Sequence, residues 1–286
     1  DDDEQFVMGD IRHTDGAAWD FCTRSLLKGA LDRLHALAGA RLYGAFEHEF
    51  QFRDAPEGQA YSYAGFRQKR AFAETLTAAM RDAGITPDTF MKEFGSGQYE
   101  VTMKPASGVR IADNSVILKE LVGIAAERSG ERVTFTPLRD PAGVGNGVHI
   151  HLSFRDDAGR PSTYDAGGKH DLSPMAGAFV AGVLKYLDGI IALTAPGVVS
   201  YGRLTPHRWS AAYNNLGYRD REAALRICPV SDVSDIARAE QFNFEFRAAD
   251  ACASPYLALA AIVHAGAQGI EEKLLCPDAS TEDLSL

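Results

Sequence analysis

The stretch AFEHEFQF, residues 45–52, places acidic or histidine side chains at alternate positions and apolar side chains between them. In a β-strand successive side chains point to opposite faces, so Glu47 and Glu49 would share one face while Phe46 and Phe50 share the other. The strand would be apolar behind and ionisable in front. Taken alone, this pattern is most typical of a half-solvated strand in an antiparallel sheet.

Three further stretches repeat the alternation. They are SGQYEVTM at 96–103, GVHIHLSF at 147–154 and QFNFEFRA at 241–248. If the polar faces of four such strands converge, several carboxylates come together, and a carboxylate cluster is unstable without cations or shared protons. The repeated pattern therefore favours one functional sheet face over four unrelated solvated edges.

Segments in which apolar residues recur with the period of an α-helix lie before, between and after these strands. They cover 19–37, 65–84, 115–130, 175–196 and 255–275. Gly84 and Gly130 follow the last periodic residue of their segments as helix stops, and Ser254 before Pro255 is typical of a helix start. This alternation predicts an α+β fold in which helices pack outside a curved, mainly antiparallel sheet.

Composition narrows the class of protein. A length of 286 residues with 45% hydrophobic content supports a sizeable core, and a net charge of −10 argues against nucleic acid or an anionic membrane as a partner. No run approaches about 18 apolar residues, and the four cysteines show neither CxxC spacing nor a disulfide framework. We expect a cytoplasmic protein with no metal site built on cysteine.

The acidic positions point to a hard divalent cation. Carboxylates with a histidine suit Mg²⁺ or Mn²⁺ better than zinc, because hard cations prefer oxygen ligands. Two sets of three ligands would leave positions open for substrate and water, as in sites where two cations clamp a phosphoryl group. The candidate ligands are Glu47, Glu49, Glu93, Glu100, His149 and Glu245. We expect His151 to support the site rather than to bind a cation.

Arginines supply the complementary charge. Four of them lie in one stretch that also contains glycine, tyrosine and asparagine, namely Arg203, Arg219, Arg221 and Arg226, and Arg247 lies beside Glu245. Guanidinium groups bind phosphate and carboxylate bidentately, and phosphate neutralisation is the better account of Arg221 and Arg226, whereas Arg219 fits a solvated position equally well. The chain has no GxxxxGK[ST] loop, no dinucleotide fingerprint before a helix and no Gly-x-Ser-x-Gly elbow.

Six segments occur in order over roughly residues 6–275, namely FEHEF, KEFGSGQYEV, GNGVHIHLS, SYGRL, RDREAALRI and FEFRAADACASPYLALAA. Together they resemble the signature segments of the catalytic domain of glutamine synthetase and its relatives. The resemblance implies the fold shared by glutamine synthetase and guanidino kinases. It also implies an ATP-dependent carbon–nitrogen ligase that phosphorylates the γ-carboxylate of glutamate, after which an amine displaces phosphate.

The resemblance assigns roles to the candidate residues. One Mg²⁺ or Mn²⁺ ion would be held by Glu49, Glu93 and Glu100, and a second by Glu47, His149 and Glu245. The ends of glutamate would be gripped by Arg203 and Arg247, with Gly145 lining the amino-acid pocket. The transferred ATP phosphate would be neutralised by Arg221 and Arg226, and the nucleotide would lie near Ser153. Arg203 and Arg221 are thus the expected catalytic residues.

The chain also departs from the family pattern. Where glutamine synthetases carry PGYEAP, this chain has PHRWSA at 206–211, so Trp209 replaces the flap glutamate that handles ammonium. An indole cannot act as that base, but its apolar wall suits an alkyl or aryl amine, as in the relatives that ligate organic amines. Glu240 and Asn243 stand where the family is basic on the nucleotide side, and Val144 replaces an asparagine.

Three alternatives to a γ-glutamyl-amine ligase stay open. They are glutamine synthesis from ammonia, which Trp209 disfavours; a non-catalytic relative that binds metal or nucleotide; and a guanidino kinase, which SYGRL and FEFR disfavour. We treat residues 1–286 as one catalytic domain. The resemblance implies that the family's N-terminal β-grasp domain and C-terminal extension are absent from this stretch, and that the protein forms a homo-oligomer, a dodecamer by analogy.

Overall fold

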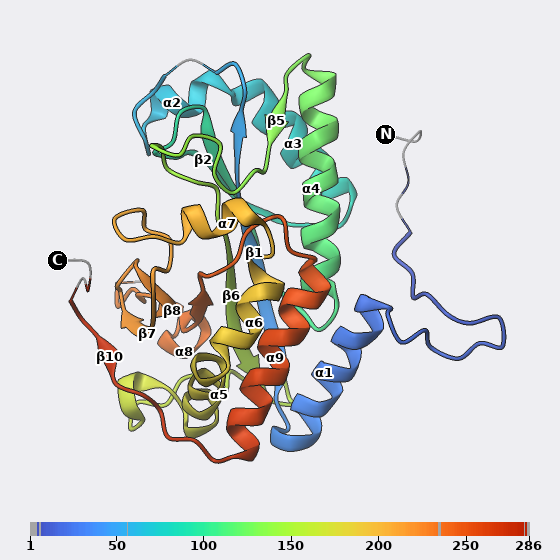
Figure 1. The fold of residues 1–286 in the computed structure, drawn as a ribbon, viewed down its shortest axis with the longest axis vertical. Coiled ribbons are helices and arrows are strands. Elements are labelled where there is room, and N and C mark those ends of the chain that lie inside the picture. The colour runs from blue at the N-terminus through green and yellow to red at the C-terminus, as the bar shows by residue number, and fades with distance from the viewer. Residues whose placement is uncertain (1–4, 6, 56, 234–235, 283, 285–286) are drawn as a thin grey trace.

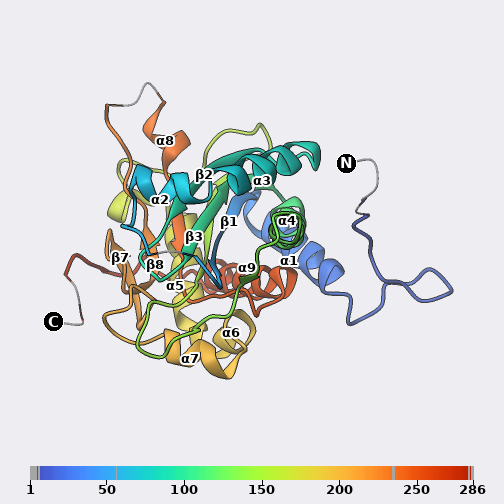
Figure 2. The ribbon, with the colours of Figure 1, turned by 90° about the horizontal axis from the view of Figure 1, so that it is seen from above.

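The computed structural model describes residues 5, 7–55, 57–233, 236–282 and 284. At its centre lies one open sheet with the spatial strand order β10-β7-β8-β9-β6-β1-β3-β2, and the short strands β4 and β5 pair with β1. Figures 1 and 2 show α1, α4 and α9 along one side of β1. The predicted α+β architecture with helices outside a sheet is confirmed.

The strands are β1 (Arg41–Phe52), β2 (Pro87–Lys92), β3 (Gln98–Met103), β4 (Ala106–Ser107), β5 (Val133–Thr134), β6 (Val148–Arg155), β7 (Tyr213–Tyr218), β8 (Ala223–Ile227), β9 (Phe244–Phe246) and β10 (Ala279–Ser280). Pairing is mainly antiparallel, and the parallel pairs are β7 with β8 and with β10. Three of the four predicted strands match closely. The fourth, 241–248, shortens to β9, and its first residue belongs to the helical turn 238–241.

The helices are α1 (Thr23–Ala38), α2 (Tyr63–Gln68), α3 (Arg70–Asp82), α4 (Arg110–Arg128), α5 (Pro174–Lys185), α6 (Leu187–Thr194), α7 (Val198–Arg203), α8 (Arg238–Gln241) and α9 (Pro255–Glu271), with a 3₁₀ turn η1 at Lys169–Asp171. Gly84 and Gly130 follow α3 and α4 with φ of 71° and 66°, as expected of helix stops. Ser254 occupies the cap position of α9, but its side chain makes no capping hydrogen bond.

Two predicted helices are each broken in two. The stretch 65–84 divides at Lys69, whose φ of −122° leaves the helical path. There the Lys69 ammonium pairs with Glu131 and lies 4.2 Å from the centre of the Phe52 ring. The stretch 175–196 divides at Tyr186, where α5 and α6 bend by 78° and the Tyr186 hydroxyl donates to Glu272. In both cases a side-chain contact outside the helix accompanies the break.

Residues 200–222, which show no clear periodicity in the sequence, contain the end of α7 and the whole of β7. Among the described residues no single helix has both the length and the apolar composition of a membrane span, and the α5–α6 pair meets that test only when its two bent halves are joined.

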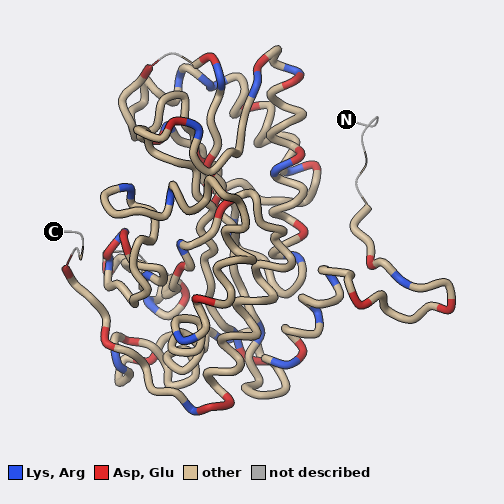
Figure 3. Tube along the Cα trace, viewed as in Figure 1, with Lys and Arg blue, Asp and Glu red and all other residues tan. Residues whose placement is uncertain are grey.

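The core follows from the strand alternation. Phe46 and Phe50 are buried on the apolar face of β1, in two clusters that reach under α1, α5 and α9 in one case and under α3 and α4 in the other. Burial of each such side chain contributes about 1.5–3 kcal/mol. Most charged positions follow the outer helices and loops in Figure 3, but acidic positions also occur at the centre of the molecule.

Candidate active site

Strand register brings the acidic side chains together. Glu49 on β1 pairs with Glu100 on β3, and Glu47 pairs with His149 on β6. The next strand adds Glu245 opposite His151. Because paired residues in a sheet point to the same face, all of these side chains lie on the face away from the helices.

A cavity of about 210 Å³ opens on this face. The sequence-predicted residues that line it are Glu47, Glu49, Glu93, Glu100, Gly145, His149, Arg203, Trp209, Arg221, Arg226 and Arg247. Glu245 does not line the cavity, but it contacts two of the arginines that do. Ser153 lines a neighbouring cavity instead. Arg219 lines neither; it lies over the ring of Tyr218, 5.3 Å from the ring centre.

The carboxylates differ in their partners. His149 Nδ1 lies 2.7 Å from Glu47 Oε1, and His151 Nε2 lies 3.3 Å from Oε2. Burial alone would raise the pKa of Glu47, but these two histidines outweigh it and hold that pKa well below its usual range. Glu49 accepts the Gly147 N–H at 2.7 Å, yet burial still raises its pKa.

Glu100 has the most perturbed environment of the acidic group. Burial, followed by repulsion from Glu47, Glu49 and Glu93, raises the pKa of Glu100 to about 10. Burial likewise raises the pKa of Glu93. Without cations Glu100 therefore holds a proton at neutral pH, and divalent cations would remove the repulsion that raises its pKa. The donor set, carboxylates with one imidazole, fits Mg²⁺ or Mn²⁺.

Glu245 is enclosed by positive charge. Its Oε1 lies 2.6 Å from Arg226 Nε and forms a second ion pair with Arg247. Burial would raise the pKa of Glu245, but the Arg247 charge and His151 hold it well below the usual range. Arg247 also donates to the backbone oxygens of Trp209, at 2.9 Å, and Arg221, at 3.1 Å. This one guanidinium therefore ties the loop around the cavity to the sheet.

Arg203 and Gly145 form a tight wall. A Cβ at Gly145 would meet the Pro137 oxygen at 2.3 Å and Arg203 Cγ at 2.7 Å, so only glycine fits there. Arg203 is buried and donates to the Ala249 oxygen at 2.7 Å. Its Nε has no hydrogen-bond partner among the described residues and is closed off from solvent, while other atoms of the side chain line the cavity.

Three aromatic rings line one side of the cavity mouth, and the sequence predicted only Trp209 among them. The rings of Trp209 and Phe94 lie 4.8 Å apart, and those of Phe94 and Tyr61 lie 5.2 Å apart. Each ring is about half exposed, and the Tyr61 hydroxyl lies 3.4 Å from Glu93 Oε2. Phe94 directly follows the candidate ligand Glu93, and this adjacency in the sequence could have identified Phe94 as a residue of the site. Nothing in the sequence around Tyr61 points to the site in the same way.

Gln98 is another residue of the site that the sequence did not single out as functional. Its side-chain amide donates to Glu49 Oε2 at 3.1 Å and to the Gly145 oxygen at 2.8 Å, so it links the acidic group to the glycine wall. Gln98 alternates with Glu100 on one strand face, and this alternation was the available signal.

The neighbouring cavity, of about 530 Å³, shares Glu47 and Glu100 with the first. Ser153, Asn243 and Glu240 line it. Glu240 is held by Arg155 at 2.7 Å, so its negative charge is paired. The two cavities therefore meet at the acidic group, and two ligands could react across that junction.

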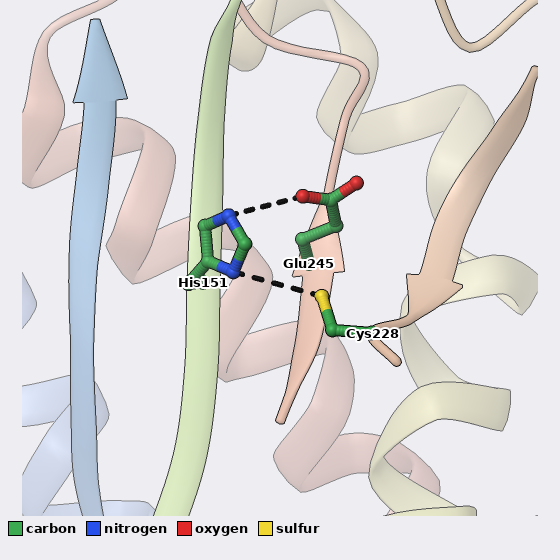
Figure 4. Close-up of side chains that lie close together, drawn as sticks. All are labelled: His151, Cys228 and Glu245. Atoms are coloured by element: carbon green, nitrogen blue, oxygen red, sulfur yellow. Dashed lines mark hydrogen bonds and ion pairs between the residues drawn. The ribbon is translucent and has the colours of Figure 1, made fainter. Parts of the chain in front are cut away.

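His151 lies at this junction. Figure 4 shows its ring between Glu245 and Cys228. Burial opposes protonation, but Cys228, Glu245 and Glu47 raise the pKa of His151 well above its usual range. His151 contacts both Glu47 and Glu245, as a supporting residue would.

Comparison with known proteins gives consistent results. Residues 20–285 match the family described as glutamine synthetase, catalytic domain. The chain is 34% identical over 281 residues to a gamma-glutamylpolyamine synthetase of Streptomyces coelicolor, covering 94% of this chain and 59% of that protein. It is 28% identical to a glutamate–isopropylamine ligase of a Pseudomonas species, covering 94% and 60%. Glutamine synthetases match at similar identity.

Among solved structures, a crystal structure of a novel glutamine synthase homolog superimposes with a TM-score of 0.89 at 44% identity, covering 94% of this chain and 64% of that one. The chain thus spans roughly three fifths of the length of the curated relatives that it matches.

Proposed function

Because this chain belongs to the glutamine synthetase family through its catalytic domain, we propose that it is the catalytic part of an ATP-dependent ligase that joins the γ-carboxylate of glutamate to an amine. The observation that carries the proposal is the junction of two cavities at one group of carboxylates, Glu47 and Glu100 being common to both. The surrounding arginines supply the charge that phosphate and carboxylate ligands require.

The proposed reaction has two steps. A γ-carboxylate oxygen of glutamate attacks the γ-phosphorus of ATP, and ADP leaves with the electrons of the broken P–O bond. The amine nitrogen then attacks the γ-carbonyl carbon of the acyl phosphate, phosphate leaves, and the nitrogen loses a proton. Arg203, which lines the cavity, would hold a carboxylate of the glutamate. Arg221 and Arg226 would neutralise the phosphate during both steps.

The donor types of the acidic group suit two hard divalent cations. Glu49, Glu93 and Glu100 would hold one, and Glu47, His149 and Glu245 the other. Bound Mg²⁺ or Mn²⁺ supplies positive charge against the phosphate oxygens. The chain's own contribution is to hold these ligands on one rigid sheet face and to keep the arginines in reach of the transferred group.

We further propose an organic amine, rather than ammonia, as the nucleophile. Trp209, Phe94 and Tyr61 offer apolar area at the cavity mouth, next to Glu93. Apolar contact with these rings favours binding of an amine with a matching substituent by about 1–3 kcal/mol. The rings carry no charge that would bind an ammonium ion. The two amine ligases among the relatives support this choice.

An assay of phosphate release tests the proposal on the full-length protein. ATP, glutamate and Mg²⁺ are supplied with ammonia or with each member of a panel of alkyl, aryl and polyamines, and the γ-glutamyl product is identified by mass. Release that depends on both glutamate and an organic amine is expected. A preference for ammonia would indicate ordinary glutamine synthesis. Cation binding without turnover would indicate a non-catalytic relative, and phosphorylation of a guanidino compound would indicate a kinase.

A further inference from the structure

The sheet face holds a second group of potential metal ligands, of different chemistry from the first. His151, Cys228 and Glu245 each offer one ligand atom, and these atoms lie within 4.8 Å of one another. In the described part of the chain no other group of three such residues reaches this spacing. The proposed reaction uses Glu245 as a hard-cation ligand but gives Cys228 no role.

Strand pairing explains why the three side chains meet. His151 on β6 lies opposite Glu245 on β9. Cys228 directly follows β8, and its N–H donates to the Asn243 oxygen at 3.1 Å, which places the thiol beside the polar face of β9. Cys228 and Glu245 are buried, and the His151 side chain is 29% exposed, which leaves a route for a cation from the cavity.

The separations suit a thiophilic cation. Cys228 Sγ lies 3.6 Å from His151 Nδ1. Zinc bonds of about 2.3 Å to sulfur and about 2.0–2.1 Å to nitrogen put two tetrahedral ligands about 3.5–3.6 Å apart. His151 Nε2 lies 3.3 Å from Glu47 Oε2, and a carboxylate in that position orients a metal-binding imidazole. Glu245 Oε2 lies 3.0 Å from the same nitrogen, so its carboxylate has to turn toward Nδ1 to bind the cation. Nδ1 now faces Asn243 Oδ1 at 2.9 Å, a contact that a bound cation would replace.

Contrary to the expectation from cysteine spacing, we propose that His151, Cys228 and Glu245 form a site for a thiophilic divalent cation of the zinc class, which shares Glu245 with one of the two hard-cation sites. Thiolate sulfur favours zinc over magnesium, so the site selects by ligand softness. When the cation binds, the Cys228 thiol and the Nδ1–H of His151, which faces Asn243 Oδ1, each give a proton to solvent. Glu245 cannot bind a cation in both sites at once. A cation bound at His151 and Cys228 therefore inhibits the ligase. Cation binding is independent of the proposed function, whereas the inhibition rests on it.

Cobalt titration of the full-length protein tests the binding. Co²⁺ replaces zinc as a coloured probe, and a thiolate ligand gives a sulfur-to-cobalt charge-transfer band in the near ultraviolet. The wild type and Cys252→Ser, a matched change at an exposed cysteine outside the group, should both show the band and lose it when Zn²⁺ is added. Cys228→Ser should lose the band and bind Co²⁺ at least ~100-fold more weakly.

An unchanged band in Cys228→Ser, or no band in the wild type, would overturn the proposal. Unchanged thermal unfolding of metal-free Cys228→Ser shows that the variant is folded. The inhibition is tested separately by Zn²⁺ titration of phosphate release at saturating Mg²⁺. Cys228→Ser should need about 10-fold more Zn²⁺ than Cys252→Ser. Equal inhibition would refute the regulatory role alone, and an inactive protein that still shows the band would refute only the proposed function.

Discussion

Buried charge at single residues governs both the stability and the chemistry of the cavity. Glu100 lies opposite Glu49 in the sheet, and its raised pKa of about 10 reflects burial and like-charge neighbours. In the metal-free protein a proton on Glu100 relieves this repulsion. A divalent cation relieves it better, but it must displace that proton.

Glu100→Gln separates these effects, because it keeps the shape of the side chain and removes its charge. We expect the metal-free stability to stay the same or to rise by about 1 kcal/mol, since Gln is neutral without the proton that Glu100 must take up on folding. The rise in melting temperature on adding Mn²⁺ should shrink markedly, and turnover should be lost. Thermal unfolding with and without Mn²⁺ measures this, with Glu120→Gln on the outer face of α4 as the control. A full Mn²⁺ response in Glu100→Gln would contradict the ligand role.

Trp209→Glu tests the choice of amine in the full-length protein. The substitution removes apolar area and restores an acid, so kcat/KM for alkyl or aryl amines relative to ammonia should fall by about 10-fold or more. Kinetics with ammonia and two amines measure the ratio. Trp19→Glu, the same change at the other tryptophan and outside the cavity lining, should leave it unaltered. An equal ratio in both variants would remove Trp209 from substrate selection.

At the scale of elements, α5 and α9 cross with their backbones in direct contact. A Cβ at Gly182 would meet the Ala265 oxygen at 2.3 Å and Gly269 Cα at 2.7 Å. The crossing packs both helices against the sheet strands that carry the site. Gly123 in α4, by contrast, has nothing within 4 Å of its missing Cβ.

Gly182→Ala should therefore destabilise the protein by about 1–3 kcal/mol through overpacking. Gly123→Ala makes the same chemical change in open space, and it should stabilise the protein by about 0.5–1 kcal/mol through helix propensity. Urea unfolding measures both variants. If the two substitutions changed stability alike, the close approach of α5 and α9 would not be the cause.

The helices and strands also show which parts of the fold could be predicted from the sequence. Alternation in 45–52 predicted both a strand and the face that carries Glu47 and Glu49, since side-chain direction in a strand follows from position alone. The helix breaks at Lys69 and Tyr186 were not predictable, because both side chains find their partners in distant segments. The grouping of Trp209, Phe94 and Tyr61 was not predictable for the same reason, since the three rings come from separate loops.

At the scale of the whole molecule, one ion-pair network joins three helices. Arg24 on α1 donates to Asp113 on α4 at 2.9 Å, and the Tyr256 hydroxyl on α9 donates to the same carboxylate at 2.6 Å. Burial would raise the pKa of Asp113, but these partners outweigh it and lower that pKa.

Homo-oligomer formation and the single-domain boundary at 1–286 stay predictions.

This network predicts a pH dependence of stability. A carboxyl group whose pKa is lowered by folding contributes stability above its unfolded pKa of about 3.9, and this is lost as pH falls through the lower folded value. Asp113→Asn should cost about 1–3 kcal/mol at pH 7, and the gap to wild type should narrow as pH falls below about 4. Urea unfolding across this range measures the gap. A gap that stays constant with pH would exclude the ion pair as its source.

Arg247 has a consequence for how this enzyme family could diversify. It anchors the loop around the cavity through the main-chain oxygens of Trp209 and Arg221. Every amino acid carries that oxygen, so a substitution at position 209 can change the side chain at the cavity mouth and still keep this hydrogen bond. If Trp209 selects the amine as proposed, natural selection could thus exchange one nitrogen source for another by single substitutions while the loop around the cavity stays anchored.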